Sequence, residues 1–123
     1  MKLSKTEEQL MELIWSHEKA FLKDLIESLP DPKPATTTIA TLLKRMQDKG
    51  FVGYTLFGNS REYYPLVNKD DYFSKQVKGI IKNFFGNSTL QFASFFTTTS
   101  NMTASELEDL KKIIDQEIKR KEK

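Results

Sequence analysis

Apolar residues recur at helical spacing in the first third of the chain and predict two helices. The first is expected over about residues 5–16, where a capping box formed by Ser4 and Glu7 precedes an apolar stripe of Leu10, Leu13 and Ile14. The second follows a short turn, and three prolines within residues 30–34 end it, because proline lacks an amide hydrogen and fixes φ. Its apolar positions are Phe21, Leu22, Leu25, Ile26 and Leu29.

The middle of the chain predicts a third helix followed at once by a β-hairpin. We expect this helix over about residues 35–49, with a stop at Gly50 and a buried face of Ile39, Leu42, Leu43 and Met46. Residues 51–57 and 61–67 are rich in aromatic and β-branched side chains, and a Gly-Asn-Ser turn joins them. This layout is typical of a winged helix-turn-helix, in which the helix enters the DNA major groove and the hairpin, or wing, lies against the phosphates.

Three further helical segments are predicted after the hairpin. The first runs from residues 68–71 to about Asn83, and a short apolar helix covers residues 88–96. After a loop at residues 97–102, a capping box from Thr103 to Glu106 opens a terminal helix, whose last residues, KRKEK, are expected to fray. The predicted fold is mainly α with a small β-hairpin wing: a winged helix-turn-helix DNA-binding domain over residues 1–68, then a helical dimerisation domain over residues 69–123.

The second half is too small to bury its own apolar residues well. It holds six of the nine phenylalanines in about 55 residues, and units of this size rarely form a sufficient core alone. We expect a homodimer in which each chain covers the apolar stripe of the other. The alternative is that these helices fold back onto the winged domain. The residues expected at the dimer interface are Phe73, Val77, Ile80, Phe92, Phe95, Leu107, Leu110, Ile114 and Ile118.

The positive charge of the chain falls partly where DNA would bind. The net charge is +2 overall, with −3 over residues 1–32, +3 over residues 33–67 and +2 over residues 68–123. Threonine offers a hydroxyl to base edges and a methyl group to thymine, while arginine and lysine bind guanine or phosphate. These residue types gather on the third helix and at the wing. We therefore expect DNA contacts from Lys33, Thr36, Thr37, Thr38, Thr41, Lys44, Arg45, Asn59 and Arg61.

Plainer interpretations of the same residues stay open at this point. Threonines at a helix start often act only as caps, and exposed basic side chains are often merely solvated. Winged helices also serve as protein-interaction modules that never touch DNA, and the near-neutral charge of residues 1–67 fits that alternative. The threonine-bearing and basic face of the third helix favours DNA.

Composition excludes several other classes of protein. The chain has no cysteine and one histidine, so disulfides, thiolate metal sites and multi-histidine metal sites within one chain are excluded, and no cofactor is expected. Neither a signal peptide nor an apolar run of about 20 residues is present, so we expect a cytoplasmic protein without membrane insertion. Nothing orders Ser16, His17 and Asp24 as nucleophile, base and orienting group, so we expect no enzyme.

Three motifs carry a resemblance to a known family. They are LSKTEEQLMELIW near the N-terminus, TTTIATLLKRMQDKGFV over the third helix, and REYYPLV on the second strand of the wing. Together they make nearly the whole chain similar to the BlaI/MecI/CopY family of bacterial repressors. The resemblance implies a winged-helix domain, a helical dimerisation domain and a palindromic operator on double-stranded DNA. By position, Thr38, Thr41 and Arg45 match the DNA-contacting residues of the family.

The resemblance also bears on how such a repressor would be released from DNA. The copper-responsive branch uses C-terminal cysteines, which this chain lacks, so copper sensing of that kind is not expected. In the antibiotic-resistance branch, a membrane sensor-protease cuts an Asn-Phe bond in the dimerisation domain. The nearest match in this chain is Gln91-Phe92, which the resemblance implies as a cleavage site.

Overall fold

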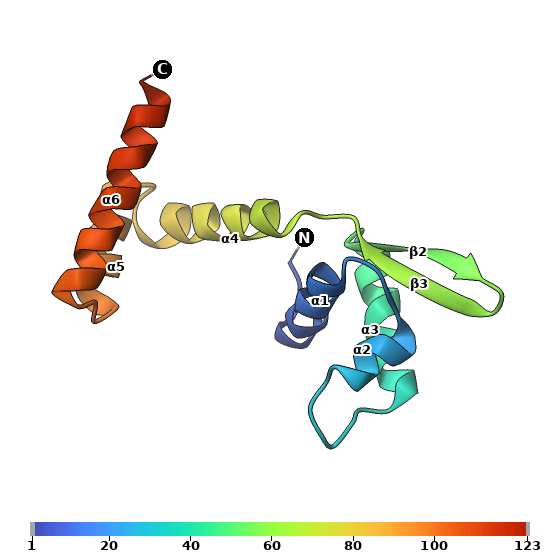
Figure 1. Ribbon diagram of the computed structural model, residues 1–123. Coiled ribbons are helices and arrows are strands. Elements are labelled where there is room, and N and C mark those ends of the chain that lie inside the picture. Colours follow the sequence, from blue (N-terminus) through green and yellow to red (C-terminus); the bar gives the residue numbers. More distant parts are fainter. Residues whose placement is uncertain (1, 123) are drawn as a thin grey trace. The chain divides into compact units, whose positions relative to one another are not determined.

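The computed structural model describes residues 2–122 and divides into two compact units, one ending at Ser74 and the other beginning at Lys75. The first unit contains three helices, a three-stranded sheet and the start of α4, and the second contains the rest of α4 with α5 and α6 (Figure 1). No helix in the described range is long and apolar enough to cross a membrane. The elements are α1 (Lys5–His17), β1 (Ala20–Phe21), α2 (Leu22–Glu27), α3 (Thr36–Asp48), β2 (Val52–Phe57), β3 (Ser60–Pro65), α4 (Lys69–Phe84), α5 (Thr89–Thr99) and α6 (Ala104–Lys121).

The core of the first unit lies between its helices and the base of its sheet. Each helix contributes one apolar stripe, as the periodicity predicts, and burial of such side chains is worth about 1.5–3 kcal/mol each. The capping box that begins α1 is confirmed: Ser4 Oγ accepts from the Glu7 amide at 3.2 Å, and Glu7 Oε1 accepts from the Ser4 amide at 2.7 Å. The largest fully buried apolar side chains are Leu10, Met11, Ile14, Leu25, Leu43, Met46 and Val52.

The wing is part of a three-stranded antiparallel sheet of order β1-β3-β2, not an isolated two-stranded hairpin. Ala20 pairs with Tyr63 and Phe21 with Glu62, so the expectation that Phe21 belongs to the second helix is wrong. Phe21 instead precedes α2, and its amide donates to the Asp24 carboxylate at 3.0 Å. A two-residue strand is too short to show an alternating pattern, which explains why the sequence did not reveal it.

The start of α4 packs with the first unit through an aromatic cluster that we define as Trp15, Phe51, Tyr72 and Phe73. The Trp15 indole donates to the Val67 carbonyl at 2.8 Å, and neighbouring ring centroids in the cluster lie 5.2–6.0 Å apart. The first compact unit therefore extends past residue 68, where the domain boundary was expected.

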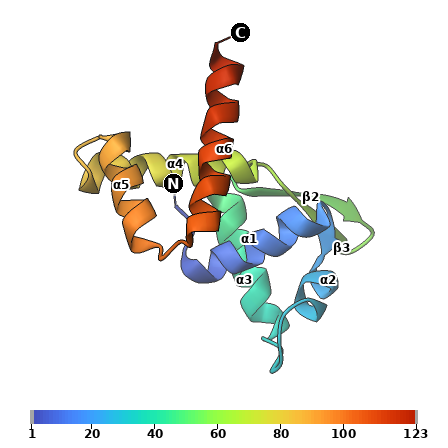
Figure 2. The same cartoon turned by 60° about the vertical axis from the view of Figure 1, so that its left-hand side comes forward.

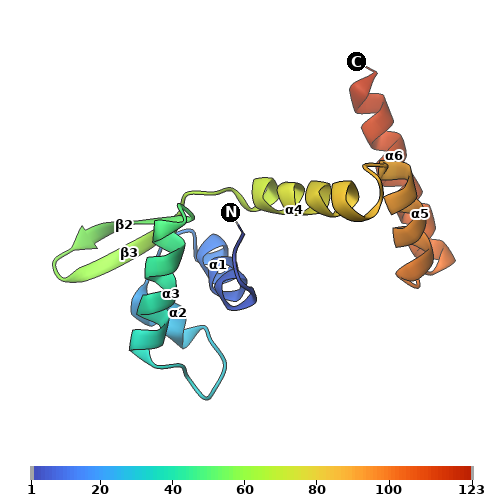
Figure 3. The ribbon, with the colours of Figure 1, turned by 180° about the vertical axis from the view of Figure 1, so that it is seen from behind.

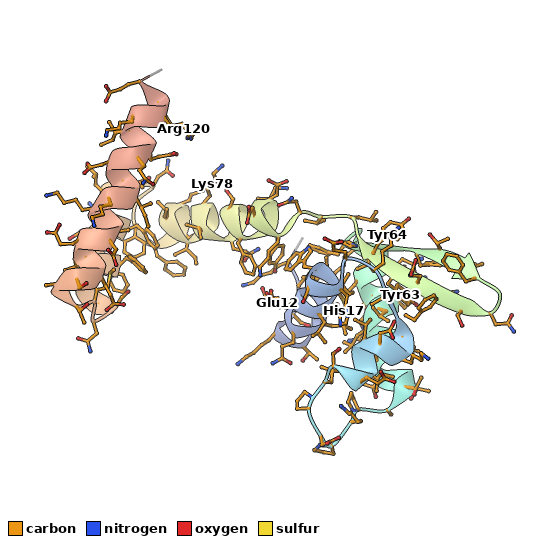
Figure 4. All side chains as sticks on the ribbon, in the orientation of Figure 1. Glu12, His17, Tyr63, Tyr64, Lys78 and Arg120 are labelled. Carbon is orange, nitrogen blue, oxygen red and sulfur yellow. The ribbon has the colours of Figure 1, made fainter. Side chains whose placement is uncertain are left out.

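Polar contacts reinforce this attachment of α4. The buried Tyr72 hydroxyl donates to Glu8 Oε2 at 2.8 Å and accepts from the Leu3 amide at 3.3 Å. Burial, and then the hydrogen bond to Glu8, raises the pKa of Tyr72. On the surface, Lys69 pairs with Glu12 at 2.5 Å; Figure 4 labels Glu12 on α1.

The second unit differs from the sequence expectation at the ends of two helices. Residues 97–99, expected in a loop, continue α5, and the Thr97 and Thr98 hydroxyls donate to helix carbonyls at 2.8–2.9 Å. α6 continues to Lys121, within the segment KRKEK that was expected to fray, and Lys123 of that segment lies outside the described residues. Arg120 donates two hydrogen bonds to Glu117, of 2.6 and 2.7 Å. The capping box at Thr103 and Glu106 is confirmed, and α5 and α6 are joined by the short turn that precedes it (Figure 2).

The second unit leaves most of its apolar side chains open. Phe85 contacts Phe92 and Phe95 at centroid distances of 5.5 and 5.3 Å, yet α5 and α6 contain no buried residue. Phe84 is 78% exposed and Leu90 84% exposed. Such a concentration of exposed apolar surface marks an interaction site.

Candidate nucleic-acid interface

Helix α3 has one buried face and one open face. Ile39, Leu42, Leu43 and Met46 are buried, as predicted. The opposite face is exposed to solvent along its whole length. This exposure is required for DNA binding, because a face packed into the core is not accessible to a duplex. The exposed face carries Thr36, Thr37, Thr38, Thr41, Lys44 and Arg45.

The threonines at the start of α3 are not caps. The N-cap residue is Ala35, which makes no side-chain hydrogen bond to the helix. The first amides of α3 therefore lack a side-chain acceptor, and a helix N-terminus in this state attracts phosphate. Thr41 does bond internally, since its hydroxyl donates to the Thr37 carbonyl at 2.9 Å. Its oxygen lone pairs and its methyl group stay available to a base edge.

The basic side chains of this surface differ in how firmly they are held. Lys44 pairs with Asp48 at 2.9 Å, but both side chains are largely exposed, and such pairs are worth less than about 1 kcal/mol. The Lys33 ammonium instead donates to the Glu27 and Leu29 carbonyls, so it caps the end of α2. The Arg45 side chain makes no hydrogen bond or ion pair within the described residues.

The wing places a second set of polar groups near its tip. Strands β2 and β3 extend from the helices as a hairpin (Figure 3), and Gly58, with φ of 62°, and Asn59 form its turn. Ser60, expected in the turn, already belongs to β3 and pairs with Phe57. The Arg61 guanidinium lies 4.3 Å from the centre of the Tyr54 ring, a cation–π contact that limits its motion.

A groove joins the two sets of residues. It is open to solvent, has a volume of about 680 Å³, and is lined by residues of α2, α3 and the wing. Thr36, Asn59 and Arg61 were expected to contact DNA, and the groove brings them together with Lys23 of α2. Lys23 was not predicted as a DNA contact, because no spacing along the chain connects α2 with the wing residues that share this groove. The full lining is Phe21, Leu22, Lys23, Ile26, Thr36, Ala40, Asn59, Ser60, Arg61 and Tyr63.

The residues that a hydrolase would need have structural partners instead. His17 Nε2 lies 3.1 Å from Ser28 Oγ, and Asp24 accepts from the Phe21 amide. Figure 4 shows His17 on α1 and Tyr63 on the wing strand β3. The Ser28 hydroxyl donates to the Asp24 carbonyl at 2.9 Å, so its proton points to a backbone oxygen.

Together, the wing and the exposed third helix define a winged-helix DNA-binding protein. The chain belongs to the penicillinase repressor family, whose family model matches residues 3–116. The methicillin resistance regulatory protein MecI of Staphylococcus aureus is 26% identical over 116 residues, which are 94% of each chain. The penicillinase repressor of Bacillus licheniformis is 22% identical over 121 residues, covering 98% of this chain and 94% of the relative.

Solved structures agree with this assignment. The solution structure of the DNA-binding domain of the repressor BlaI is similar with a TM-score of 0.52 and 28% identity, over 58% of this chain and 88% of that domain. The oxidized form of MarR from E. coli matches with a TM-score of 0.51 and 16% identity, over 95% of this chain and 76% of MarR, and shows a likeness of fold. The protein is therefore a transcriptional repressor, and the family to which it belongs consists of regulators.

Proposed function

We propose that this protein acts as a homodimer that binds a palindromic operator, with α3 of each chain in the major groove and each wing against the backbone. The observation that carries the proposal is the open face of α3, whose polar side chains are exposed while the opposite face forms the core. A dimer would present two such helices, and two-fold symmetry in the protein fits two-fold symmetry in the operator.

The exposed apolar surface of the second unit supports the dimer. Val77, Ile80, Phe95, Ile114 and Ile118 are each 41–51% exposed, and Leu107 is 39% exposed. Leu110 and Phe92 are only partly buried. Phe73 lies in the aromatic cluster of the first unit and is still 40% exposed, so part of its side chain is open to a partner. A second copy of the chain is the simplest partner, because in a symmetric dimer each chain covers the exposed apolar residues of the other.

Replacement of Arg45 by Ala should weaken operator binding by roughly 10- to 100-fold per half-site, because a bidentate contact from arginine to guanine is worth about 1–3 kcal/mol. Fluorescence anisotropy at fixed salt, with a duplex selected from random DNA, measures this loss. Arg120→Ala is the matched control, since Arg120 lies on α6 and pairs with Glu117. Equal affinity of Arg45→Ala and wild type would exclude base reading by Arg45.

Salt dependence separates DNA binding from a protein-interaction role of the same fold. The logarithm of the binding constant should fall linearly with the logarithm of salt concentration, with a slope near −0.9 for each phosphate contacted. A slope near zero, or no binding at about 50 mM salt, would contradict the proposal.

Cleavage of the second unit is the proposed route of induction, with a membrane sensor-protease as partner. The Gln91–Phe92 bond lies in the first turn of α5, directly after the N-cap Ser88, whose hydroxyl accepts from the Gln91 amide at 3.2 Å. Proteases bind extended segments, so this turn must open before cleavage, and helix ends open most easily. Mass spectrometry of the protein from induced cells tests this: a fragment ending at Gln91 is expected, and an intact chain during induction would contradict it.

A further inference from the structure

The groove between α2, the start of α3 and the wing has the charge and lining of a site for an anionic chain. None of the ten residues that line it is acidic, and two are cationic, Lys23 from α2 and Arg61 from β3. Neither cation forms an ion pair with a carboxylate of the described residues. The Tyr54 ring already holds the Arg61 guanidinium, so less side-chain entropy is lost when Arg61 binds an anion.

The remaining lining is mainly apolar. Leu22, Ile26 and Ala40 offer carbon surface to the groove, together with Phe21 and Tyr63. A sugar-phosphate strand combines the complementary groups, because its deoxyribose carbons separate charged phosphates. The groove is open rather than enclosed, which suits a chain that passes through it.

We propose that one strand of the operator backbone lies in this groove, with Lys23 and Arg61 binding phosphates of that strand. This inference rests on the proposed function and deepens it, because it adds Lys23 and α2 to the DNA-binding surface. It also fixes the path of the backbone between α3 and the wing, so that Thr36 at the start of α3 lies beside the same strand.

The test compares the salt slopes of the full chain and its variants on one selected operator. Lys23→Gln should make the slope shallower by about 0.9 for each chain bound, which is about 1.8 for a dimer, and Arg61→Gln should do the same. Lys23→Arg keeps the charge and should keep the slope. Lys78→Gln is the matched control, because Lys78 is an exposed lysine on α4 that does not line the groove (Figure 4).

Operators with a single neutral methylphosphonate make the test specific to one contact. One position in each half-site should weaken wild-type binding and leave Lys23→Gln binding unchanged. If Lys23→Gln keeps the wild-type slope while wild type binds, the groove proposal is overturned and the proposed function stands. Absence of wild-type binding to any duplex refutes both. A further outcome also overturns the proposal. If 2-naphthoate binds saturably and Lys23→Gln abolishes that binding while keeping the wild-type salt slope for DNA, the groove is a site for a small amphipathic anion.

Discussion

Ile114→Asp is expected to turn the protein into a monomer at micromolar concentration. Ile114 lies on the apolar stripe of α6 and is 51% exposed in the single chain. In a dimer that covers this stripe, the substitution places two carboxylates in an apolar contact, and burial of an unpaired charge costs several kcal/mol for each ion. Sedimentation velocity measures the change directly.

Operator binding should fall with the dimer. Two half-sites bound by one dimer benefit from effective concentration, which adds roughly 10²- to 10⁴-fold in affinity, and a monomer loses this gain. Gln116→Asp is the matched control, because it adds the same charge to the exposed polar side of the same helix. Dimers that persist in Ile114→Asp would place the interface elsewhere, with the exposed apolar face of α4 as the next candidate.

Long periodic segments allowed most of the fold to be predicted from the sequence. α1, α3 and the two wing strands were predicted within a few residues, because each combines a clear apolar period with a cap, a glycine stop or a tight turn. The apolar period also predicted which face of α3 is exposed. Its four apolar residues form the buried side, so the threonines and basic residues on the opposite side face solvent.

Features that depend on distant contacts were missed. Strand β1 is only two residues long and exists because β3 pairs with it. The extension of α5 through residues 97–99 was missed because a run of threonines suggests a loop, whereas in the helix the Thr97 and Thr98 hydroxyls bond back to helix carbonyls. Lys23 joins the groove only after the chain folds, so no spacing in the sequence connects it with Arg61.

A buried ion pair links the start of α1 to the end of α3. Glu7 is 2% exposed, and its Oε1 lies 2.7 Å from the Lys49 ammonium. Its Oε2 is buried without a hydrogen-bond partner in the described range. Burial raises the pKa of Glu7, but the hydrogen bonds from Lys49 and Ser4 together outweigh it, so the pKa lies below its ordinary value of 4.5. The ionised carboxylate thus stabilises the fold above pH 4.5, and this contribution is lost as the pH falls through the lowered pKa.

Lys49→Met is therefore expected to destabilise the first unit by about 3 kcal/mol, because it leaves a buried carboxylate without its cation. Trp15, the single tryptophan, lies in this unit, so denaturation followed by its fluorescence reports on it. Lys44→Met, which breaks only the exposed pair with Asp48, should cost less than about 0.5 kcal/mol and is the matched control on the same helix.

The pH dependence and a double variant test the cause of this loss. Without Lys49, the pKa of Glu7 rises relative to wild type, so the loss of stability on acidification below pH 4.5 should become smaller. Glu7→Gln combined with Lys49→Met removes the buried charge and should recover part of the stability lost in Lys49→Met alone. A glutamine at this position still accepts from the Ser4 amide, so the substitution removes the charge and keeps the cap. A double variant less stable than Lys49→Met would therefore show that the unpaired carboxylate is not the cause of the loss.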